Sequence, residues 1–117
     1  MKNKQIETFL SPLEDAVLNE LFSGKELTTR EIFRLLNKKK KEAALTSIAV
    51  SLDRLHSSGL VSRRIETCRG GLRYLYKSGG NKEDVYRLMV SRSVDKILRR
   101  FGPVASSYFN ERFNKGK

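Results

Sequence analysis

The sequence has few of the residues that build disulfides, metal sites and catalytic triads. Its 117 residues include one cysteine, one histidine and no tryptophan. A single cysteine excludes an intramolecular disulfide and a zinc site built from cysteines. A single histidine excludes histidine-rich metal sites and argues against a Ser-His-Asp triad. Since no pair of carboxylates suggests acid–base catalysis either, we expect a protein that is not an enzyme and uses no cofactor or metal.

Long hydrophobic runs are also absent from the sequence. No apolar run approaches the ~20 residues needed to span a membrane, and residues 1–6 are polar and lack the apolar region of a signal peptide. These absences predict a cytoplasmic protein. The length suits one domain, or a small domain with an appended element.

Acidic residues are scarce, and the excess of positive charge is unevenly spread. The chain has 24 basic and 13 acidic residues, a formal net charge of +11. Residues 1–33 have a net charge of −2, residues 34–77 of +8 and residues 78–117 of +5. Apolar residues recur within the basic block, so we expect a structured face rather than a disordered tail. The alternative is a merely solvated surface, but the charge exceeds what solubility requires and favours a polyanionic partner.

Three helices are predicted in the first half of the chain. Ser11, Pro12 and Glu14 form a capping box that starts a helix running to about Ser23. A second capping box at Thr28 starts a helix that runs into the four lysines of residues 38–41. A third helix begins near Leu45 or Thr46 and ends at Gly59, after a loop over about residues 41–45. The apolar residues of the third helix, Ile48, Leu52 and Leu55, share one face.

A β-hairpin is predicted after the third helix. Residues 60–66 read as a strand, residues 68–71 as a glycine-containing turn, and residues 72–77 as the return strand. Tyr74 and Tyr76 are expected in the core of the hairpin. Three helices followed by a hairpin are typical of the winged helix-turn-helix. The predicted fold class is therefore mainly α with a small β-hairpin that forms the wing.

The last third of the chain predicts helices that need a partner. Asn81 can cap a long helix whose apolar stripe extends over about 20 residues, or roughly 30 Å, and Gly102-Pro103 separates it from a short amphipathic helix. We expect residues 1–79 to form the winged domain and residues 80–117 a dimerisation segment that pairs with a second copy, the alternative being a fold-back onto its own domain. The residues expected in this contact are Val85, Leu88, Met89, Val94, Ile97, Leu98, Phe101, Val104, Tyr108 and Phe109.

Several stretches of sequence resemble the penicillinase and methicillin-resistance repressors of the BlaI/MecI/CopY type. They are Thr29-Arg30-Glu31-Ile32, Leu52-Asp53-Arg54-Leu55, Gly59-Leu60-Val61, the basic wing before Tyr74-x-Tyr76, and residues 94–101 followed by Gly102-Pro103-Val104-Ala105. The resemblance covers about residues 10–113. It implies a homodimeric repressor that binds an inverted repeat of double-stranded DNA, with its third helix in the major groove.

The resemblance places the base-reading positions at Thr46, Ser47, Ala49 and Val50. Some members have Lys or Arg at the first and third of these positions, so the operator sequence is not carried over. Copper-responsive members use a cysteine cluster near the C-terminus, which the single Cys68 excludes here. Antibiotic-responsive members lose repression when a sensor protease cleaves them, so the implied partners include a sensor protease or another inducer.

The residues themselves suggest how such a protein would contact DNA. Thr46 and Ser47 can hydrogen-bond base edges or phosphates, and Ala49 and Val50 can touch thymine methyl groups. Asp53 would repel DNA, so we expect it to pair with a neighbouring cation. The basic candidates for the DNA backbone are Arg30, Lys40, Lys41, Arg54, Arg69, Arg73 and Lys77.

The sequence predicts a sequence-specific DNA-binding transcriptional regulator and leaves two alternatives open. One is a winged-helix module of a larger nucleic-acid or protein complex, and the other is a non-specific chromatin protein. Cys68 is open to two interpretations as well. It is either a thiol sensor, with a pKa lowered by cationic neighbours such as Arg69, or a small turn residue with no special role.

Overall fold

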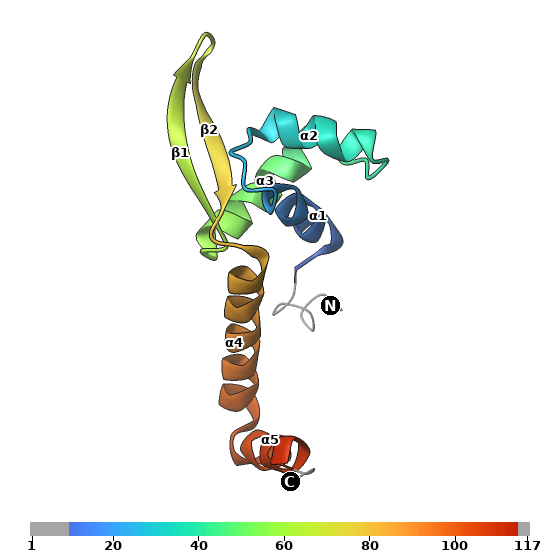
Figure 1. Ribbon diagram of the computed structural model, residues 1–117, viewed down its shortest axis with the longest axis vertical. Coiled ribbons are helices and arrows are strands. Elements are labelled where there is room, and N and C mark those ends of the chain that lie inside the picture. Colours follow the sequence, from blue (N-terminus) through green and yellow to red (C-terminus); the bar gives the residue numbers. More distant parts are fainter. Residues whose placement is uncertain (1–9, 115–117) are drawn as a thin grey trace. The chain divides into compact units, whose positions relative to one another are not determined.

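The computed structural model describes residues 10–114, so the polar segment of residues 1–6 lies outside the described residues. Within the described range the chain contains five helices and one antiparallel hairpin. Figure 1 labels these elements along the chain. The elements are α1 Pro12–Leu21, α2 Thr29–Lys38, α3 Leu45–Ser57, β1 Val61–Cys68, β2 Gly71–Ser78, α4 Lys82–Phe101 and α5 Pro103–Asn114. The predicted class, mainly α with a small hairpin, is confirmed.

The chain divides into two compact units. One unit is Leu10–Val85, which contains α1, α2, α3 and the hairpin. The described part of the other unit begins at Tyr86 and contains the remainder of α4 together with α5. The functional division at residues 79 and 80 stays a prediction.

Both predicted capping boxes are present. The Ser11 hydroxyl accepts from the Glu14 amide at 3.1 Å, and the Ser11 amide donates to the Glu14 carboxylate at 2.9 Å. Thr28 and Glu31 repeat this arrangement at 3.2 and 2.8 Å. Each box supplies acceptors for amides that the first helical turn leaves unpaired. Helix α1 ends at Leu21, slightly before the predicted end at Ser23.

Helix α2 ends at Lys38, so it runs into the lysines of residues 38–41 as predicted and stops at the first of them. The Lys41 amide donates to the Leu36 carbonyl at 2.9 Å and the Lys40 amide to the Asn37 carbonyl at 3.0 Å. This is the Schellman pattern that closes a helix. Lys40 occupies its left-handed position with φ +61°, where glycine is usual. Lys39 turns back to α1 and pairs with Glu20 at 2.7 Å.

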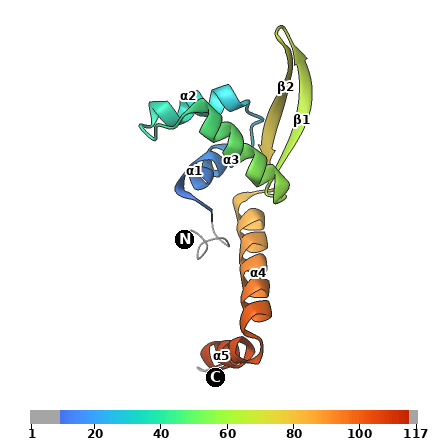
Figure 2. The ribbon, with the colours of Figure 1, turned by 180° about the vertical axis from the view of Figure 1, so that it is seen from behind.

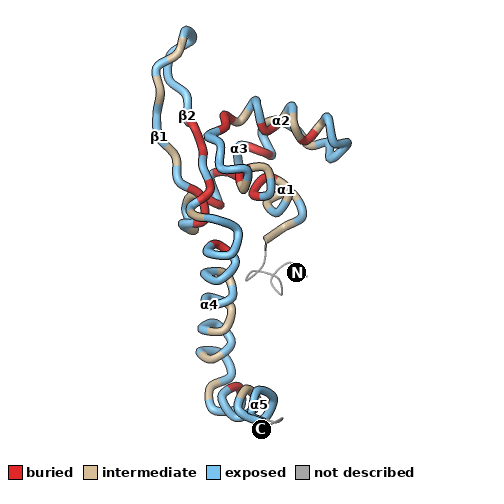
Figure 3. Tube along the Cα trace, in the orientation of Figure 1, coloured by how far each residue is buried: buried red, intermediate tan, exposed pale blue. Residues whose placement is uncertain are grey.

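The hydrophobic core of the first unit lies between α1, α2 and α3 and reaches the base of the hairpin. Figure 3 shows buried positions on the inner faces of these helices and exposed positions over the outer part of the hairpin. The largest fully buried side chains are Val17, Leu18, Leu21, Ile32, Leu36, Ile48, Leu52 and Leu55. Burial of Ile48, Leu52 and Leu55 confirms the predicted inner face of the third helix.

The hairpin is longer and its turn tighter than the sequence predicted. Cys68 pairs directly with Gly71, so the turn contains two residues, Arg69 and Gly70. Gly71 has φ +123°, a conformation that other residues rarely adopt. At the base of the hairpin, an isolated bridge pairs Leu27 with Tyr76.

Only the base of the hairpin belongs to the core, and Figure 2 shows α3 lying beside that base. Leu75 and Tyr76 are 8% and 4% exposed, although they point to opposite faces of the strand. Tyr74 is 40% exposed, so its assignment to the hairpin core was wrong. The reason is that β1 and β2 extend past the helices that could cover them.

Candidate nucleic-acid interface

The N-terminal half of helix α3 presents a small, uncharged surface opposite its buried face. Burial of Ile48 and Leu52 turns the other side of the helix outward. The four predicted base-reading residues, Thr46, Ser47, Ala49 and Val50, are all exposed, and Val50 is 50% exposed. Short side chains here allow another surface to come close to the helix axis.

The N-terminus of α3 has no side-chain cap. Its N-cap residue is Ala44, which has no hydrogen-bonding group to offer the first amides of the helix. Helices α1 and α2, by contrast, both begin with full capping boxes. The amides of Thr46 and Ser47 are therefore left without a side-chain acceptor at Ala44, at the positively polarised end of the helix. This feature was missed in the sequence, although the absence of Ser, Thr, Asp or Asn at position 44 could have revealed it.

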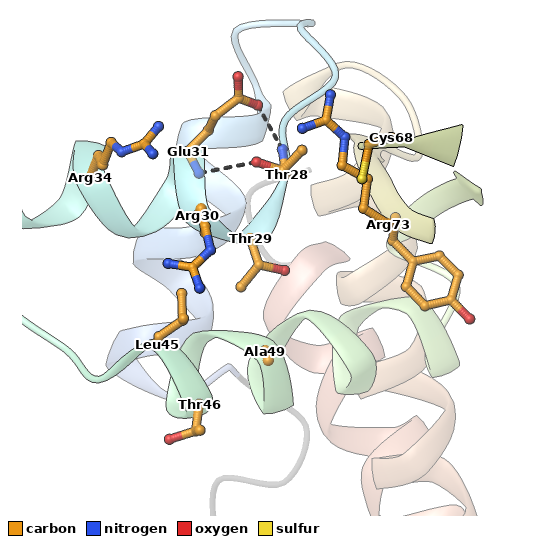
Figure 4. A pocket seen from close by; sticks show the side chains of 11 residues that line it. Thr28, Thr29, Arg30, Glu31, Arg34, Leu45, Thr46, Ala49, Cys68 and Arg73 are labelled. Carbon is orange, nitrogen blue, oxygen red and sulfur yellow. Dashed lines mark hydrogen bonds between the residues drawn. The ribbon is translucent and has the colours of Figure 1, made fainter. Parts of the chain in front are cut away.

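A pocket of about 580 Å³ lies between α2, α3 and the hairpin, all within the first unit. Figure 4 shows Arg30 and Arg34 on α2, and Leu45, Thr46 and Ala49 on α3. Four of the predicted contact residues, Arg30, Thr46, Ala49 and Arg73, line this one pocket. Its other lining residues are Thr28, Thr29, Glu31, Arg34, Leu45, Cys68 and Tyr74.

The remaining predicted contacts on α3 lie along its other side. Ser47, Val50 and Arg54 line a second hollow with Ser11 and Leu13 of the α1 region. Lys40 and Lys41 line a third hollow, together with Ser47 and the carboxylate-bearing Asp15. The structure thus surrounds the exposed face of α3 with cationic side chains, but it distributes them over separate hollows.

The arginines of this unit divide into ion-paired and unpaired groups. Among the described residues, no ion pair involves Arg30, Arg34, Arg54 or Arg69, and all four are exposed. Arg63, Arg64 and Arg73 on the hairpin each pair with a carboxylate. An unpaired cation can meet a phosphate without first breaking an internal contact.

The expected pairing of Asp53 is confirmed. Arg63 of β1 donates to the Asp53 carboxylate at 2.8 Å, and its guanidinium lies 4.1 Å from the centre of the Tyr74 ring. The hydrogen bond to Asp53 raises the pKa of Arg63 above its ordinary range. The pair neutralises the one carboxylate of α3 and joins that helix to the hairpin.

Two further carboxylates neutralise arginines of the hairpin. Glu26 accepts two hydrogen bonds from Arg64, both at 2.8 Å, and this contact lowers the pKa of the Glu26 carboxyl. Glu66 accepts from Arg73 at 2.6 and 3.0 Å and raises the pKa of the Arg73 guanidinium. Arg73 was predicted to contact the DNA backbone. Glu66 was not recognised as its partner because the sequence did not give the strand register in detail.

The second unit exposes much apolar surface on its helices. Exposed fractions are 38% for Leu88 and Ile97, 57% for Phe101, 74% for Val104 and 52% for Tyr108. Met89, Val94, Leu98 and Phe109 are partly exposed. Val85, also predicted in the contact between copies, is only 3% exposed and belongs to the unit Leu10–Val85.

A family model described as penicillinase repressor matches residues 10–114. The chain belongs to the penicillinase repressor family. The resemblance inferred from the sequence is thereby confirmed over nearly the same residues. Membership in this family makes the chain a DNA-binding transcriptional regulator. No curated protein matches the sequence, and no helix among the described residues is long and apolar enough to cross a membrane.

Solved structures place this penicillinase repressor family member among winged-helix proteins. A possible transcriptional regulator from Methanosarcina mazei Go1 has a TM-score of 0.61 and 15% identity, over 87% of this chain and 90% of that one. A PadR family transcription regulator from Clostridium difficile R20291 has a TM-score of 0.56 and 17% identity, over 78% and 98%. The Aeropyrum pernix Orc1 protein, solved in complex with DNA, has a TM-score of 0.58 and 17% identity, over 72% and 25%. At these identities the likeness is one of fold alone.

Proposed function

We propose that the protein is a homodimeric repressor that binds an inverted-repeat operator. In this proposal α3 enters the major groove, and the hairpin, with Arg69 at its tip and Lys77 near its base, contacts the flanking backbone. The residues proposed for base reading are Thr46, Ser47, Ala49 and Val50. Because none of them is an arginine that could read guanine through two hydrogen bonds, contacts to thymine methyl groups and single hydroxyl hydrogen bonds should dominate recognition.

The observation that carries this proposal is the contrast between the two sides of α3. Ile48 and Leu52 are 0% exposed, whereas the outward side is small, uncharged at its N-terminal half and flanked by exposed arginines. A solvated helix in so basic a chain would be expected to have lysines there. Major grooves admit a helix, and small side chains allow its axis to approach the base edges.

Dimerisation through α4 and α5 is proposed from their exposed apolar residues. Large exposed apolar surfaces mark interaction sites in soluble proteins, and long helices gain most of their stability from packing. A second copy of the chain offers the same apolar residues and supplies the two-fold symmetry that an inverted repeat requires. Half-sites should then lie about 34 Å apart, or a multiple of this distance.

Selection of bound duplexes from a random pool tests DNA binding, specificity and symmetry together. The expected result is one enriched site with two-fold symmetry and a discrete footprint. Enrichment of no sequence, with binding to every duplex, would instead identify a non-specific chromatin protein. Enrichment of RNA over duplex DNA, or a stable monomer in sedimentation, would favour a module of a larger complex. A gel shift at low salt without binding to any duplex would overturn the proposal.

Two substitutions separate backbone contacts from base reading. Arg69→Ala should weaken binding to all duplexes alike, because a phosphate contact contains no sequence information. Val50→Ala should change the enriched sequence, with little effect on binding to random DNA. Lys25→Ala, on the loop before α2, removes one exposed charge away from α3 and serves as the control for charge alone. Equal effects of Arg69→Ala and Lys25→Ala would contradict a specific role of the wing tip.

A further inference from the structure

We propose that Glu66 is an internal competitor for Arg73, which holds the guanidinium of Arg73 on the wing and limits how strongly the wing binds any polyanion. This inference rests on the proposed contact of the wing with DNA, and it adds a residue that sets the strength of binding without touching DNA. Because a phosphate contact contains no sequence information, Glu66 would weaken the binding of the wing to operator and random DNA alike.

The pairing of Glu66 with Arg73 is built into the register of the hairpin. The two residues are direct cross-strand partners, so their side chains leave the same face of the sheet. Arg73 donates from Nε at 3.0 Å and from Nη2 at 2.6 Å, both to Oε2 of Glu66. Two of the guanidinium donors of Arg73 are therefore occupied, although 49% of its side chain is exposed.

The neighbouring charges direct Glu66 toward Arg73. Glu66 also lies near Arg64, but at 3.9 Å, and Arg64 is held by two hydrogen bonds of 2.8 Å to Glu26. The four side chains form a row of neighbouring ion pairs in the order Glu26, Arg64, Glu66 and Arg73. The row contains two positive and two negative charges. The middle of the wing thus has two arginines but no formal net charge from this group, in contrast to Arg69 at the tip.

The ion pair of Glu66 with Arg73 affects DNA binding because of where Arg73 lies. Arg73 lines the same pocket as Thr46 and Ala49, two of the proposed base-reading residues, and Figure 4 shows it at the side where the hairpin meets α2. Phosphate oxygens and carboxylates accept from a guanidinium in similar geometry. A phosphate that approaches the pocket therefore competes with Glu66 for the same donors, and each such exchange reduces the gain from the new contact.

A purely structural role for Glu66 predicts a different result. Ion pairs between exposed side chains contribute little to stability, and Glu66 is 30% exposed. If Glu66 served only to hold the hairpin together, its removal would loosen the wing and weaken binding. If it competes with DNA, its removal would strengthen binding and steepen the dependence on salt, because one more phosphate contact forms.

The test compares the intact protein with Glu66→Gln, Arg73→Gln and the double variant. Elution from heparin, a polyanion without base pairs, gives a first readout, and affinity for a random duplex between about 50 and 200 mM salt gives a second. We expect Glu66→Gln to elute at higher salt, to bind the random duplex roughly fivefold to tenfold more tightly at 0.1 M salt, and to steepen the salt slope by about 0.9 per wing. In the Arg73→Gln background, Glu66→Gln should have little effect.

The Arg73→Gln background is the matched control, since the same carboxylate is removed in both comparisons and only its partner differs. If circular dichroism shows that Glu66→Gln folds poorly, Glu66→Thr removes the same charge. Threonine is well suited to a β-strand. Unchanged or weaker binding to both heparin and duplex would overturn the inference, and so would a gain that persists without Arg73. If the intact protein binds heparin but no duplex, the proposed function fails, while the heparin comparison still decides the role of Glu66.

Discussion

Arg63 on β1 and Asp53 on α3 form an ion pair of 2.8 Å that joins the hairpin to the candidate recognition helix. The two side chains differ in environment, since 22% of Arg63 and 70% of Asp53 is exposed. Asp53 stands on the side of α3 that faces outward, where a free carboxylate would repel phosphates. The pairing therefore has an electrostatic consequence for DNA binding as well as a structural one.

Replacing Arg63 should weaken DNA binding even though no contact of Arg63 with DNA is proposed. Arg63→Gln leaves the Asp53 carboxylate without its partner and should reduce affinity for all duplexes by up to roughly tenfold at 0.1 M salt, the effect of about one phosphate contact. The free energy of unfolding should change little, because the Asp53 side of the pair is exposed to solvent. Fluorescence anisotropy and urea unfolding measure the two effects.

The double variant Asp53→Asn with Arg63→Gln is the control for this prediction. Removing both charges should restore most of the affinity, because neither a carboxylate nor its partner remains. If affinity stays low in the double variant, the loss arises from the packing of Arg63 on Tyr74 rather than from the charge of Asp53.

A new cap on α3 should separate stability from DNA binding. Ala44 already has the extended backbone of an N-cap residue, with φ −70° and ψ 149°. Ala44→Ser should stabilise the protein by about 0.5–1 kcal/mol, because a hydroxyl can accept from the amides of the first turn. Ala44→Asp should stabilise it similarly but weaken DNA binding by roughly tenfold, since it places an anion at the start of the helix proposed to enter the major groove, where it would repel phosphates. Equal affinity of the two variants would argue against a phosphate at this helix end.

A charge placed on the apolar surface of α4 should produce monomers. Phe101 is 57% exposed, and Phe101→Glu adds an anion to the surface proposed to contact a second copy. Sedimentation equilibrium should show a shift to monomer, and affinity for an inverted repeat should fall toward that for a single half-site. Arg99→Glu introduces the same side chain about 200° around the helix from Phe101 and should leave the dimer intact. If Phe101→Glu and Arg99→Glu both produce monomers, then either the contact lies elsewhere or the position of the added charge on α4 does not matter.

Alkaline pH should destabilise the first unit through Tyr76. Burial raises the pKa of its phenol above the ordinary 10.0, and the hydrogen bond from Arg63 opposes this shift. The unfolded phenol ionises near pH ~10 and the folded one only at higher pH, so the unfolded state loses its proton first. The free energy of unfolding should thus be unaffected by Tyr76 below about pH 10 and should fall as the pH rises through the folded pKa.

Tyr76→Phe should flatten this alkaline loss, as measured by urea unfolding at about pH 9 and pH 11. Tyr108→Phe removes a tyrosine that is 52% exposed and should leave the slope as it is in the intact protein. A slope that Tyr76→Phe does not change would mean that other groups cause the alkaline transition.

Local patterns predicted the helices well because helix ends are encoded by nearby residues. The two capping boxes and the spacing of Ile48, Leu52 and Leu55 involve residues three or four positions apart, which the sequence displays directly. The order of elements then led to the winged helix-turn-helix, and several short stretches of sequence led to the correct family. The outward side of α3 followed from the same periodicity, because the buried face fixes the opposite one.

The end of α2 and the hairpin were harder to predict because their structure depends on backbone conformation and strand register. Nothing in a run of four lysines indicates which residue adopts the left-handed conformation that closes the helix at Lys40. The strand period places Tyr74 and Tyr76 on the same side of β2. Only the base of the hairpin meets the helices, so Tyr76 is buried and Tyr74 is exposed.

The sequence predicted the amount and distribution of charge, but it did not predict which charged side chains pair with one another. The composition alone established an excess of positive charge and its concentration in residues 34–77, because charge counts do not depend on conformation. Which cations remain available depended on contacts between distant residues, such as Arg64 with Glu26 and Arg63 with Asp53. Such partners meet only when the strands and helices have packed, and the tertiary structure therefore decided that Arg73 is paired while Arg69 at the tip is not.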